Sequence, residues 1–553
     1  MHTTAKIPAS RRQLAIVAAS LILALAPLPA IAFGQSTVLI PDQVVDTDAA
    51  ARSLSEGKEF EEQQRWLDAL SHYNDAIREF PDDEQLKKRH TLAEIHCDIE
   101  RRHADSSYLD FASRVTEQQA LESFSEITGK VESHYVEVPR WHQLAWRGTA
   151  NLYVALSKKS FVDRHLSHST PEQINGFLTL LRDDVNRRVI RSRNDARDLA
   201  AYAGRLGSRH LRLEPTLVLL EYCCGAISSL DQYSSYLTSD QLDEVYNQIE
   251  GNFVGLGIEL KAEDDSLLIV NVIPGGPADQ SGIRGGDRIV MVDGHSTDDV
   301  STERAADMLK GVEKSIVRVR ILSAQNETRD LAIRRARVEV PCVENTRIID
   351  DQSGIGYFRL TSFQKTTSRD VDAALWKLHR QGMKSLIVDV RGNPGGLLTA
   401  SVEVADKFVH EGTIVSTRGR SPRENYEYPA HQVGTWPMPL IVLIDRDTAS
   451  ASEIFAGAIR DHDRGRIVGE KSYGKGSVQG IFPLSISRAG VRLTTAKFFS
   501  PSGHQISKRG VLPNHPVHSA ARPIGHELPN NLGDDPVLQS AVNLAQMTVA
   551  QRQ

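Results

Sequence analysis

The sequence has few cysteines and no pattern that binds a metal. Only four cysteines occur in 553 residues, and their spacing matches none of the usual zinc motifs. Cys223 and Cys224 are adjacent, so a bridge between them would be strained. We expect buried free thiols, with a long-range disulfide as the alternative. We also expect no metal and no other cofactor.

A strong charge of either sign is absent too. The chain carries 65 Lys and Arg against 71 Asp and Glu, which gives a net charge of −6. Surfaces that bind nucleic acids are normally basic, so we expect no nucleic-acid partner. Charged residues at 25% and apolar residues at 40% are ordinary for a globular protein. The length exceeds what one core can hold and predicts three or four domains.

Long apolar runs are missing except near the N-terminus. There, basic residues precede the run from Leu14 to Leu28, and Ala30-Ile31-Ala32 closes it. This order is typical of a secretory signal peptide, which we place at residues 1–32. The alternative is a membrane anchor, which needs about 20 apolar residues. We expect export to the periplasm or cell envelope, with no membrane span after cleavage.

Two helical regions follow. Residues 33–116 contain small and aromatic residues at the spacing of one tetratricopeptide repeat, and these are Gly57, Phe60, Ala69, Tyr73, Ala76 and Pro81. A generic helical hairpin is the alternative, because one repeat cannot form a solenoid. Residues 117–249 keep apolar residues three and four positions apart, which predicts a second helical domain.

Over residues 250–338 the helical pattern gives way to short β-rich runs. The stretch "FVGLGIEL" is followed by "GIRGGDRIVMVDG" and a helix candidate, "STERAADMLKG". This ordered set resembles a PDZ domain. The resemblance implies that the loop Gly255-Leu256-Gly257-Ile258 binds a peptide's terminal carboxylate while the peptide adds as a strand. The alternative is a small β-rich domain without a ligand.

Residues 339–517 alternate apolar strands with helices. "SLIVDV" ends at "RGNPGG", and "PLIVLID" ends at "RDTAS" before a helix. Units of this kind predict an α/β core with a mixed sheet covered by helices. Sites in such sheets lie in turns after the carboxyl ends of strands. The turns 391–396 and 446–450 are therefore the candidate site, and residues 518–553 are predicted as a C-terminal tail.

Ser450 stands at the start of the helix after the second turn. With Glu453 three residues later it matches a capping box, which is the structural alternative. Small residues on either side, Ala449 and Ala451, leave room for a substrate backbone. The helix start also offers unpaired N–H donors that suit a developing oxyanion.

A serine nucleophile needs a base, and Lys475 is the candidate in "SYGKGS". Its ammonium would have to lose a proton near neutral pH, which requires burial or positive neighbours that lower its pKa. Gly474 and Gly476 permit the tight packing that burial needs. The alternative is an ordinary solvated lysine.

The motifs together resemble the C-terminal processing peptidases, also called tail-specific proteases. The stretch "TASASEIFAGAIRDHDRGRIVGEKSYGKGSVQ" resembles the signature of that family. Further motifs that resemble the family occur in order, and they are "LDQYSSYL", "GLGIEL", "DVRGNPGGLL" and "SPSGHQISKRGVLPNHPV". The resemblance extends from about Leu230 to Val517. The helices before it match only loosely.

The resemblance implies the roles of single residues. Ser450 would be the nucleophile, Lys475 the general base, and Gln479 a residue that orients the lysine. On one strand, positions 475 and 479 would point the same way. The oxyanion donors would be the N–H of Ala451 and of a glycine in Gly395-Gly396.

Asp461 matches an aspartate that matters in some relatives. On one helix it would lie about 16 Å along the axis from Ser450. We therefore expect it to hold a neighbouring loop, through an arginine such as Arg464 or Arg466. Ser452 and Glu453 are interpreted as helix-start structure.

The signal peptide and the family resemblance together imply an exported serine endopeptidase that cleaves near the C-terminal region of protein substrates. Its partners would be proteins or peptides with free C-termini, and a homo-oligomer or adaptor protein stays open. The main alternative is an inactive PDZ and tetratricopeptide scaffold. An esterase is a third reading, but the chain lacks a G-x-S-x-G elbow.

Overall fold

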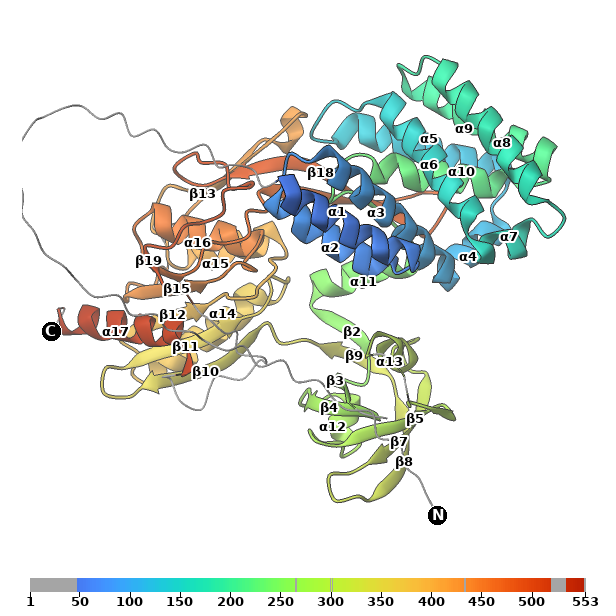
Figure 1. Cartoon of the computed structure of the whole chain (residues 1–553). Helices are drawn as coiled ribbons and strands as arrows, with labels where there is room; N and C mark the ends of the chain where they lie inside the picture. The colour runs from blue at the N-terminus through green and yellow to red at the C-terminus, as the bar shows by residue number, and fades with distance from the viewer. Residues whose placement is uncertain are drawn as a thin grey trace, which may run out of the picture.

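The computed structural model describes residues 47–263, 266–298, 300, 302–431, 434–518 and 534–551. The predicted signal peptide lies outside these residues. Figure 1 shows a helical N-terminal region, a small β-rich domain below it and an α/β core beside both. This arrangement confirms the predicted multidomain α/β fold class. Among the described residues, no helix is long and apolar enough to cross a membrane.

Ten helices precede the first described strand. They are α1 (Thr47–Glu62), α2 (Trp66–Glu79), α3 (Glu84–Ala104), α4 (Ser106–Arg114), α5 (Glu117–His134), α6 (Trp141–Ser157), α7 (Lys159–His165), α8 (Pro171–Arg187), α9 (Arg193–Leu211) and α10 (Pro215–Ser228). Capping boxes begin α5, α8 and α9 at Thr116, Thr170 and Ser192. These boxes satisfy N–H groups that the first turn leaves unpaired.

The first hairpin packs as the small residues predicted. A Cβ on Gly57 of α1 would lie 2.2 Å from the ring of Tyr73 on α2, so the helices approach closely only because this residue is glycine. The Tyr73 hydroxyl donates to Glu61 at 2.6 Å. The tetratricopeptide assignment itself stays a prediction.

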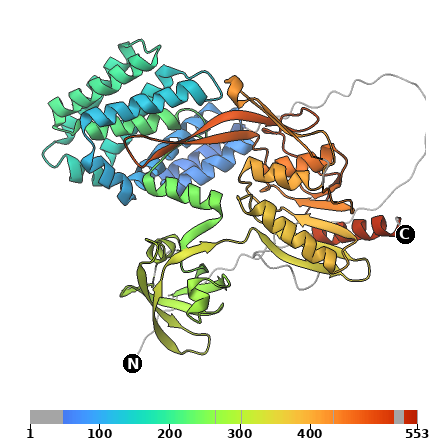
Figure 2. The same cartoon turned by 180° about the vertical axis from the view of Figure 1, so that it is seen from behind.

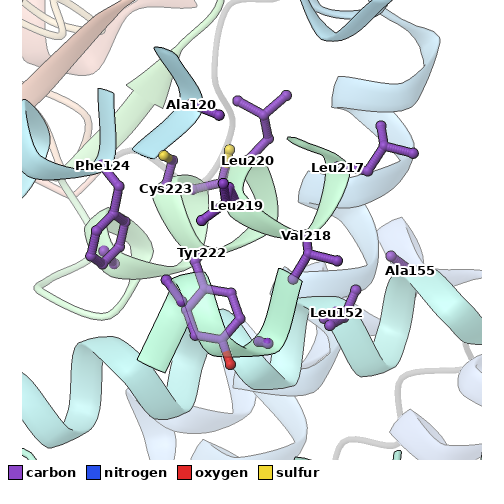
Figure 3. Packing of buried hydrophobic residues seen from close by; sticks show 14 of the residues in the cluster. Ala120, Phe124, Leu152, Ala155, Leu217, Val218, Leu219, Leu220, Tyr222 and Cys223 are labelled. Carbon is purple, nitrogen blue, oxygen red and sulfur yellow. The ribbon is translucent and has the colours of Figure 1, made fainter. Parts of the chain in front are cut away.

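Helix α10 forms the centre of the helical region. Residues 216–227 are all buried, as expected for a helix surrounded by others. Figure 3 shows Leu219 and Tyr222 of α10 among side chains of neighbouring helices such as Phe124 and Leu152. All four cysteines are free, and three are buried while Cys97 is half-buried. This outcome confirms free thiols and corrects the expected burial of Cys97.

The β-rich domain is joined to the rest by a two-stranded ribbon. Strand β2 (Asn252–Gly255) pairs antiparallel with β9 (Ala336–Glu339). The main sheet has the order β3-β4-β5-β7-β8, with β6 beside β5. Its elements are β3 (Ile258–Glu263), β4 (Ser266–Val272), α12 (Pro277–Gln280), β5 (Arg288–Val292), β6 (His295–Ser296), α13 (Thr302–Leu309), β7 (Ile316–Leu322) and β8 (Thr328–Arg334).

The core is built on a six-stranded sheet in the order β10-β11-β12-β15-β16-β19. These strands are β10 (Val343–Asp350), β11 (Ile355–Leu360), β12 (Ser385–Asp389), β15 (Leu440–Ile444), β16 (Arg466–Gly469) and β19 (His515–Pro516). Only β10 is antiparallel to its neighbour. The sheet is therefore mixed, as predicted.

Helices cover both faces of this sheet. Helices α14 (Thr367–Arg380), α15 (Leu398–Asp406) and α16 (Ala451–Asp461) pack on one face. Helix α17 (Pro536–Ala550) packs on the other, over alternate residues of β11, β12 and β15 (Figure 1). The predicted tail thus contains a helix that completes the core.

A second, antiparallel sheet links the core to the helical region. It contains β1 (Ser235–Leu237), β13 (Thr413–Gly419), β14 (Tyr426–Pro429), β17 (Ser477–Pro483) and β18 (Gly490–Phe499). Figures 1 and 2 both show β18 extending from the core to the N-terminal helices. Helix α11 (Ser239–Glu250) and the short η1 (Pro422–Glu424) complete the described elements. A separate second sheet was not predicted from the sequence.

Candidate active site

The two candidate turns lie side by side at one edge of the core sheet. Strands β12 and β15 are parallel neighbours, with Asp389 opposite Leu443. Their carboxyl ends therefore meet, and each is followed at once by a turn. This is the placement that the alternation of strands and helices predicted.

Asn393 locks the two turns together. Its carbonyl oxygen accepts hydrogen bonds from the N–H of Ala449 at 3.0 Å and from the hydroxyl of Ser452 at 3.1 Å. Its side-chain Oδ1 accepts the N–H of Gly395 at 2.9 Å, and its Nδ2 donates to the carbonyl of Leu360 at 2.8 Å. Ser452 therefore joins the turns and does not cap the helix. The sequence analysis missed Asn393.

The glycine pair is required by close packing. Gly395 and Gly396 have φ of +102° and +142°. A Cβ on Gly395 would lie 2.8 Å from the nitrogen of Ala451, and one on Gly396 would lie 2.0 Å from the carbonyl oxygen of Phe363. The N–H of Gly395 is used by Asn393. Within the described part of the chain, the N–H groups of Ala451 and Gly396 have no acceptor.

Ser450 has a strained backbone. Its φ is +58° and its ψ is −117°, a region that favours glycine. A residue held there costs on the order of 1–3 kcal/mol and is characteristic of functional turns. The sequence lacks the glycine-flanked elbow motif, yet the chain makes a strained strand-to-helix turn with Ala449 and Ala451 as neighbours.

Glu453 connects the serine turn to the lysine loop. Its side chain is fully buried, and its Oε2 accepts the N–H groups of Ser450 and of Lys475, each at 2.8 Å. Its Oε1 accepts the N–H of Gly474 at 2.7 Å and the hydroxyl of Ser472 at 2.6 Å. Burial raises the pKa of Glu453, and these donors oppose the shift. The sequence analysis assigned this residue only to the helix start. Its position among the apolar residues of "ASEIFAGAI" was the available signal.

Lys475 is half-buried, and its pKa lies below the ordinary value. Burial is the main cause and the positive charge of Arg492 adds to it, while Glu453 and Asp231 oppose the shift. The Nζ atom lies 4.9 Å from the ring centroid of Tyr233. Among the described residues, no hydrogen-bond acceptor or ion-pair partner meets this Nζ.

Gln479 lies in β17, where its Nε2 donates to the hydroxyls of Ser477 at 2.9 Å and Thr494 at 3.5 Å. The prediction that placed Lys475 and Gln479 on one strand is wrong. The strand begins only at Ser477, and its pairing shifts register between Val478 and Gln479.

Asp461 holds a loop, but not through an arginine. It accepts the N–H of Ser502 at 3.2 Å and the hydroxyl of the same residue at 2.5 Å. Arg464 instead donates to backbone carbonyls, and Arg466 pairs with Asp463 at 3.1 Å. The loop function is thus right and the predicted partner is wrong.

A buried ion-pair network begins the glycine turn. Arg391 pairs with Asp389 at 2.6 Å and with Asp535, which precedes α17, at 2.7 Å. The Tyr357 hydroxyl also donates to Asp389 at 2.9 Å. Burial opposes the ionisation of Asp389, but Arg391 outweighs it and lowers the pKa of that carboxyl. No sequence pattern indicated the contribution of Asp535.

The β-rich domain has an apolar groove of about 210 Å³. The predicted loop lines it together with α13, through Phe253, Gly255, Leu256, Gly257, Ile258, Leu260, Ala306, Leu309 and Lys310. Gly257 has a φ of +77°, which suits a tight loop before β3. The groove thus lies between β3 and a helix, the arrangement in which an extended peptide adds to a sheet edge.

Two family models match the chain. The model described as peptidase family S41 matches residues 354–517, and the PDZ domain model matches residues 248–322. The first match covers both candidate turns and Lys475. The second covers every residue that lines the groove.

Curated relatives extend the match. A carboxy-terminal-processing protease of Bartonella bacilliformis is 37% identical over 297 residues, which cover 52% of this chain and 67% of the relative. A carboxyl-terminal-processing protease of a Picosynechococcus species is 33% identical over 323 residues, 58% of this chain and 76% of the relative. The solved structure of a photosystem II D1 C-terminal processing protease is 26% identical, covering 77% of this chain and 97% of its own, with a TM-score of 0.38. The sequence matches show that the chain belongs to the S41 family and is a serine-type, C-terminal processing endopeptidase with a PDZ domain.

Proposed function

We propose that this protein is an exported endopeptidase that cuts near the C-terminal region of proteins through a Ser450–Lys475 dyad. One observation carries the proposal. A single carboxylate oxygen of Glu453 accepts the backbone N–H groups of both residues at 2.8 Å, so the serine turn and the lysine loop are held against each other. The strained backbone of Ser450 and the lowered pKa of Lys475 support the same roles.

Acylation begins with neutral Lys475. Its amine takes the proton of the Ser450 hydroxyl while the Oγ attacks a peptide carbonyl. The lysine ammonium then gives this proton to the leaving amine as the tetrahedral intermediate collapses to an acyl-enzyme. Gln479 directs its amide Nε2 at Ser477 and Thr494, so its Oε1 is available as an acceptor that could orient the amine of Lys475 during the reaction.

The oxyanion is stabilised by backbone donors. The N–H groups of Ala451 and Gly396 suit this role because they have no acceptor within the described residues. The N–H of Gly395 is already bound to Asn393, so the donor from the glycine pair is Gly396. Donors fixed before the reaction need no reorganisation as charge develops.

Deacylation uses the same lysine. A water oxygen attacks the acyl ester while Lys475 accepts a proton from that water. The lysine then returns the proton to the Ser450 oxygen as the ester bond breaks. The new C-terminal carboxylate and the free hydroxyl are the products. One residue thus serves as base and acid in both halves of the reaction.

The PDZ groove selects substrates by their free C-termini. Its apolar lining favours apolar terminal side chains, and the loop Gly255–Gly257 presents backbone N–H groups to a carboxylate. Export rests on the basic, apolar and A-x-A pattern of residues 1–32.

Cleavage of an unfolded protein with an apolar C-terminus tests the proposal. Ser450→Ala and Lys475→Ala should each lower kcat by at least ~10³-fold, because nucleophile and base act as one unit. Lys471→Ala, an exposed lysine four residues earlier, is the matched control and should cleave normally. Normal cleavage by both dyad variants would refute the proposal.

A further inference from the structure

The segment 230–234 is the motif "LDQY" with the serine that follows, and none of the roles above uses it. It connects α10, the last helix of the helical region, to β1. Within it, the Tyr233 ring lies 4.9 Å from the Nζ of Lys475. Tyr233, which follows the last helix before β1, thus lies over Lys475, the proposed general base in the core.

Asp231 fixes the backbone of this segment. Its Oδ1 accepts the N–H of Tyr233 at 2.8 Å and of Ser234 at 2.9 Å. The same oxygen accepts the hydroxyl of Thr494 on β18 at 3.2 Å, and the Ser234 hydroxyl accepts the N–H of Thr494 at 3.2 Å. The segment is therefore bound to the strand that reaches from the core.

Arg492 binds the segment from the same strand. Its Nε donates to the carbonyl of Tyr233 at 3.1 Å. In the sheet it lies opposite Ser235 of β1 and Ile481 of β17. The guanidinium is half-buried, and burial lowers its pKa.

Core packing does not account for the position of Tyr233. Its neighbours Leu230 and Tyr236 pack against the hydrophobic cluster of the helical region. Tyr233 belongs to none of the hydrophobic clusters of the described residues and is half-buried. The Nζ of Lys475 lies over its ring.

We propose that Tyr233 is a positioning residue that covers Lys475 and excludes water from it, and that Arg492 holds this cover in place. The helical region then completes the active site of the core. This inference rests on the proposed role of Lys475 as the base.

The groups that face Lys475 act in opposite directions. Burial and the charge of Arg492 on β18 favour the neutral amine and lower the lysine pKa, whereas Glu453 on α16 and Asp231 in the segment favour the ammonium. The face of the Tyr233 ring attracts a cation, which also favours the ammonium. Excluding water has a larger effect on the lysine pKa and lowers it, because a buried ammonium loses the hydration of its charge. Removing the ring or the arginine should therefore raise the lysine pKa.

The test compares pH profiles of kcat/KM for Tyr233→Leu, Tyr233→Phe, Arg492→Gln and Arg492→Lys. Lys475 acts as the neutral amine, so activity rises as pH passes its pKa. We expect the acid limb of Tyr233→Leu and Arg492→Gln to move by about one unit to higher pH, with recovery above the limb. Tyr233→Phe keeps the ring and Arg492→Lys keeps the charge, so their limbs should stay near the parent's.

The outcomes separate this inference from the proposed function. A limb that stays in place, or a loss equal at every pH, would overturn the role of the cover, since a structural residue lowers activity without moving the limb. Should Tyr233→Leu fail to fold, Tyr233→Met decides in the same way, because it also removes the ring and leaves the charge of Arg492 in place. Full activity of Lys475→Ala would instead refute the dyad, whatever Tyr233 does.

Discussion

Each of the two turns of the site is flanked by a buried carboxylate, and the two carboxylates are stabilised differently. Asp389 ends β12 and is paired with the guanidinium of Arg391, so its pKa is lowered. Glu453 lies in the first turn of α16 and receives four hydrogen bonds but no ion pair from the described residues, and burial raises its pKa. Their exposed fractions are 2% and 0%, so burial alone does not separate them.

The difference indicates two tasks. A charge balanced by a bidentate arginine is a stable anchor, and here it fixes the start of the glycine turn against α17 through Asp535. A carboxylate held only by N–H and O–H donors depends on their exact placement. Glu453 therefore reports on the relative position of the serine turn and the lysine loop.

Breaking the paired side of this comparison should have the largest effect. Arg391→Met leaves two buried carboxylates without their ion-pair partner and should lower the free energy of unfolding by about 3–5 kcal/mol. Urea unfolding measures it, with the exposed Arg380→Met as control. A loss no greater than the control's would show that the network is not an anchor.

Breaking the unpaired side should affect catalysis. Glu453→Gln offers one acceptor oxygen where two are needed and turns an NH2 group toward N–H donors. We expect kcat/KM to fall by about 10²-fold, the effect of misplacing catalytic groups by about 1 Å. Peptide cleavage measures this, and Glu403→Gln on the exposed face of α15 is the control. Activity equal to the control's would remove Glu453 from the account.

Asp535→Asn sharpens the comparison with a smaller change. Asparagine can still accept the N–H of Leu538 and cap the helix, and Arg391 still pairs with Asp389. The expected loss in the free energy of unfolding is about 1.5–3 kcal/mol, the contribution of hydrogen bonds to a charged group. Chemical unfolding measures this loss, with a variant of the exposed neighbour, Asp534→Asn, as the control. A cost as large as that of Arg391→Met would mean that Asp535 is the main partner of the arginine.

The two carboxylates should also differ in the sign of their pH dependence. The lowered pKa of Asp389 gives stability that is present above its unfolded value and lost as pH falls through the folded one. The raised pKa of Glu453 gives stability that is present below its unfolded value and lost as pH rises through the folded one. As pH falls, the difference in Tm between the parent and Asp389→Asn should therefore become smaller. The difference between the parent and Glu453→Gln should become larger. Two gaps that change in the same direction would contradict the assignment.

The sequence predicted the parts of the site that local patterns encode. Apolar runs located β12 and β15, and their parallel order brought the turns together. The roles proposed for Ser450 and Lys475 came from a family resemblance. The contacts that hold these residues could not be read, because they join distant segments: Tyr233 meets Lys475, and Asp535 meets Arg391. Gln479 shows the same limit, since a register shift in the sheet cancelled a simple alternation.

The most direct test is the pH dependence of covalent labelling by a fluorophosphonate, followed by intact mass and mapped to a peptide. The account predicts one adduct, on Ser450, formed faster as pH rises through a lysine pKa below its ordinary value and lost in Lys475→Ala. Labelling of another residue, or an unchanged rate in Lys475→Ala, would contradict the Ser450–Lys475 dyad.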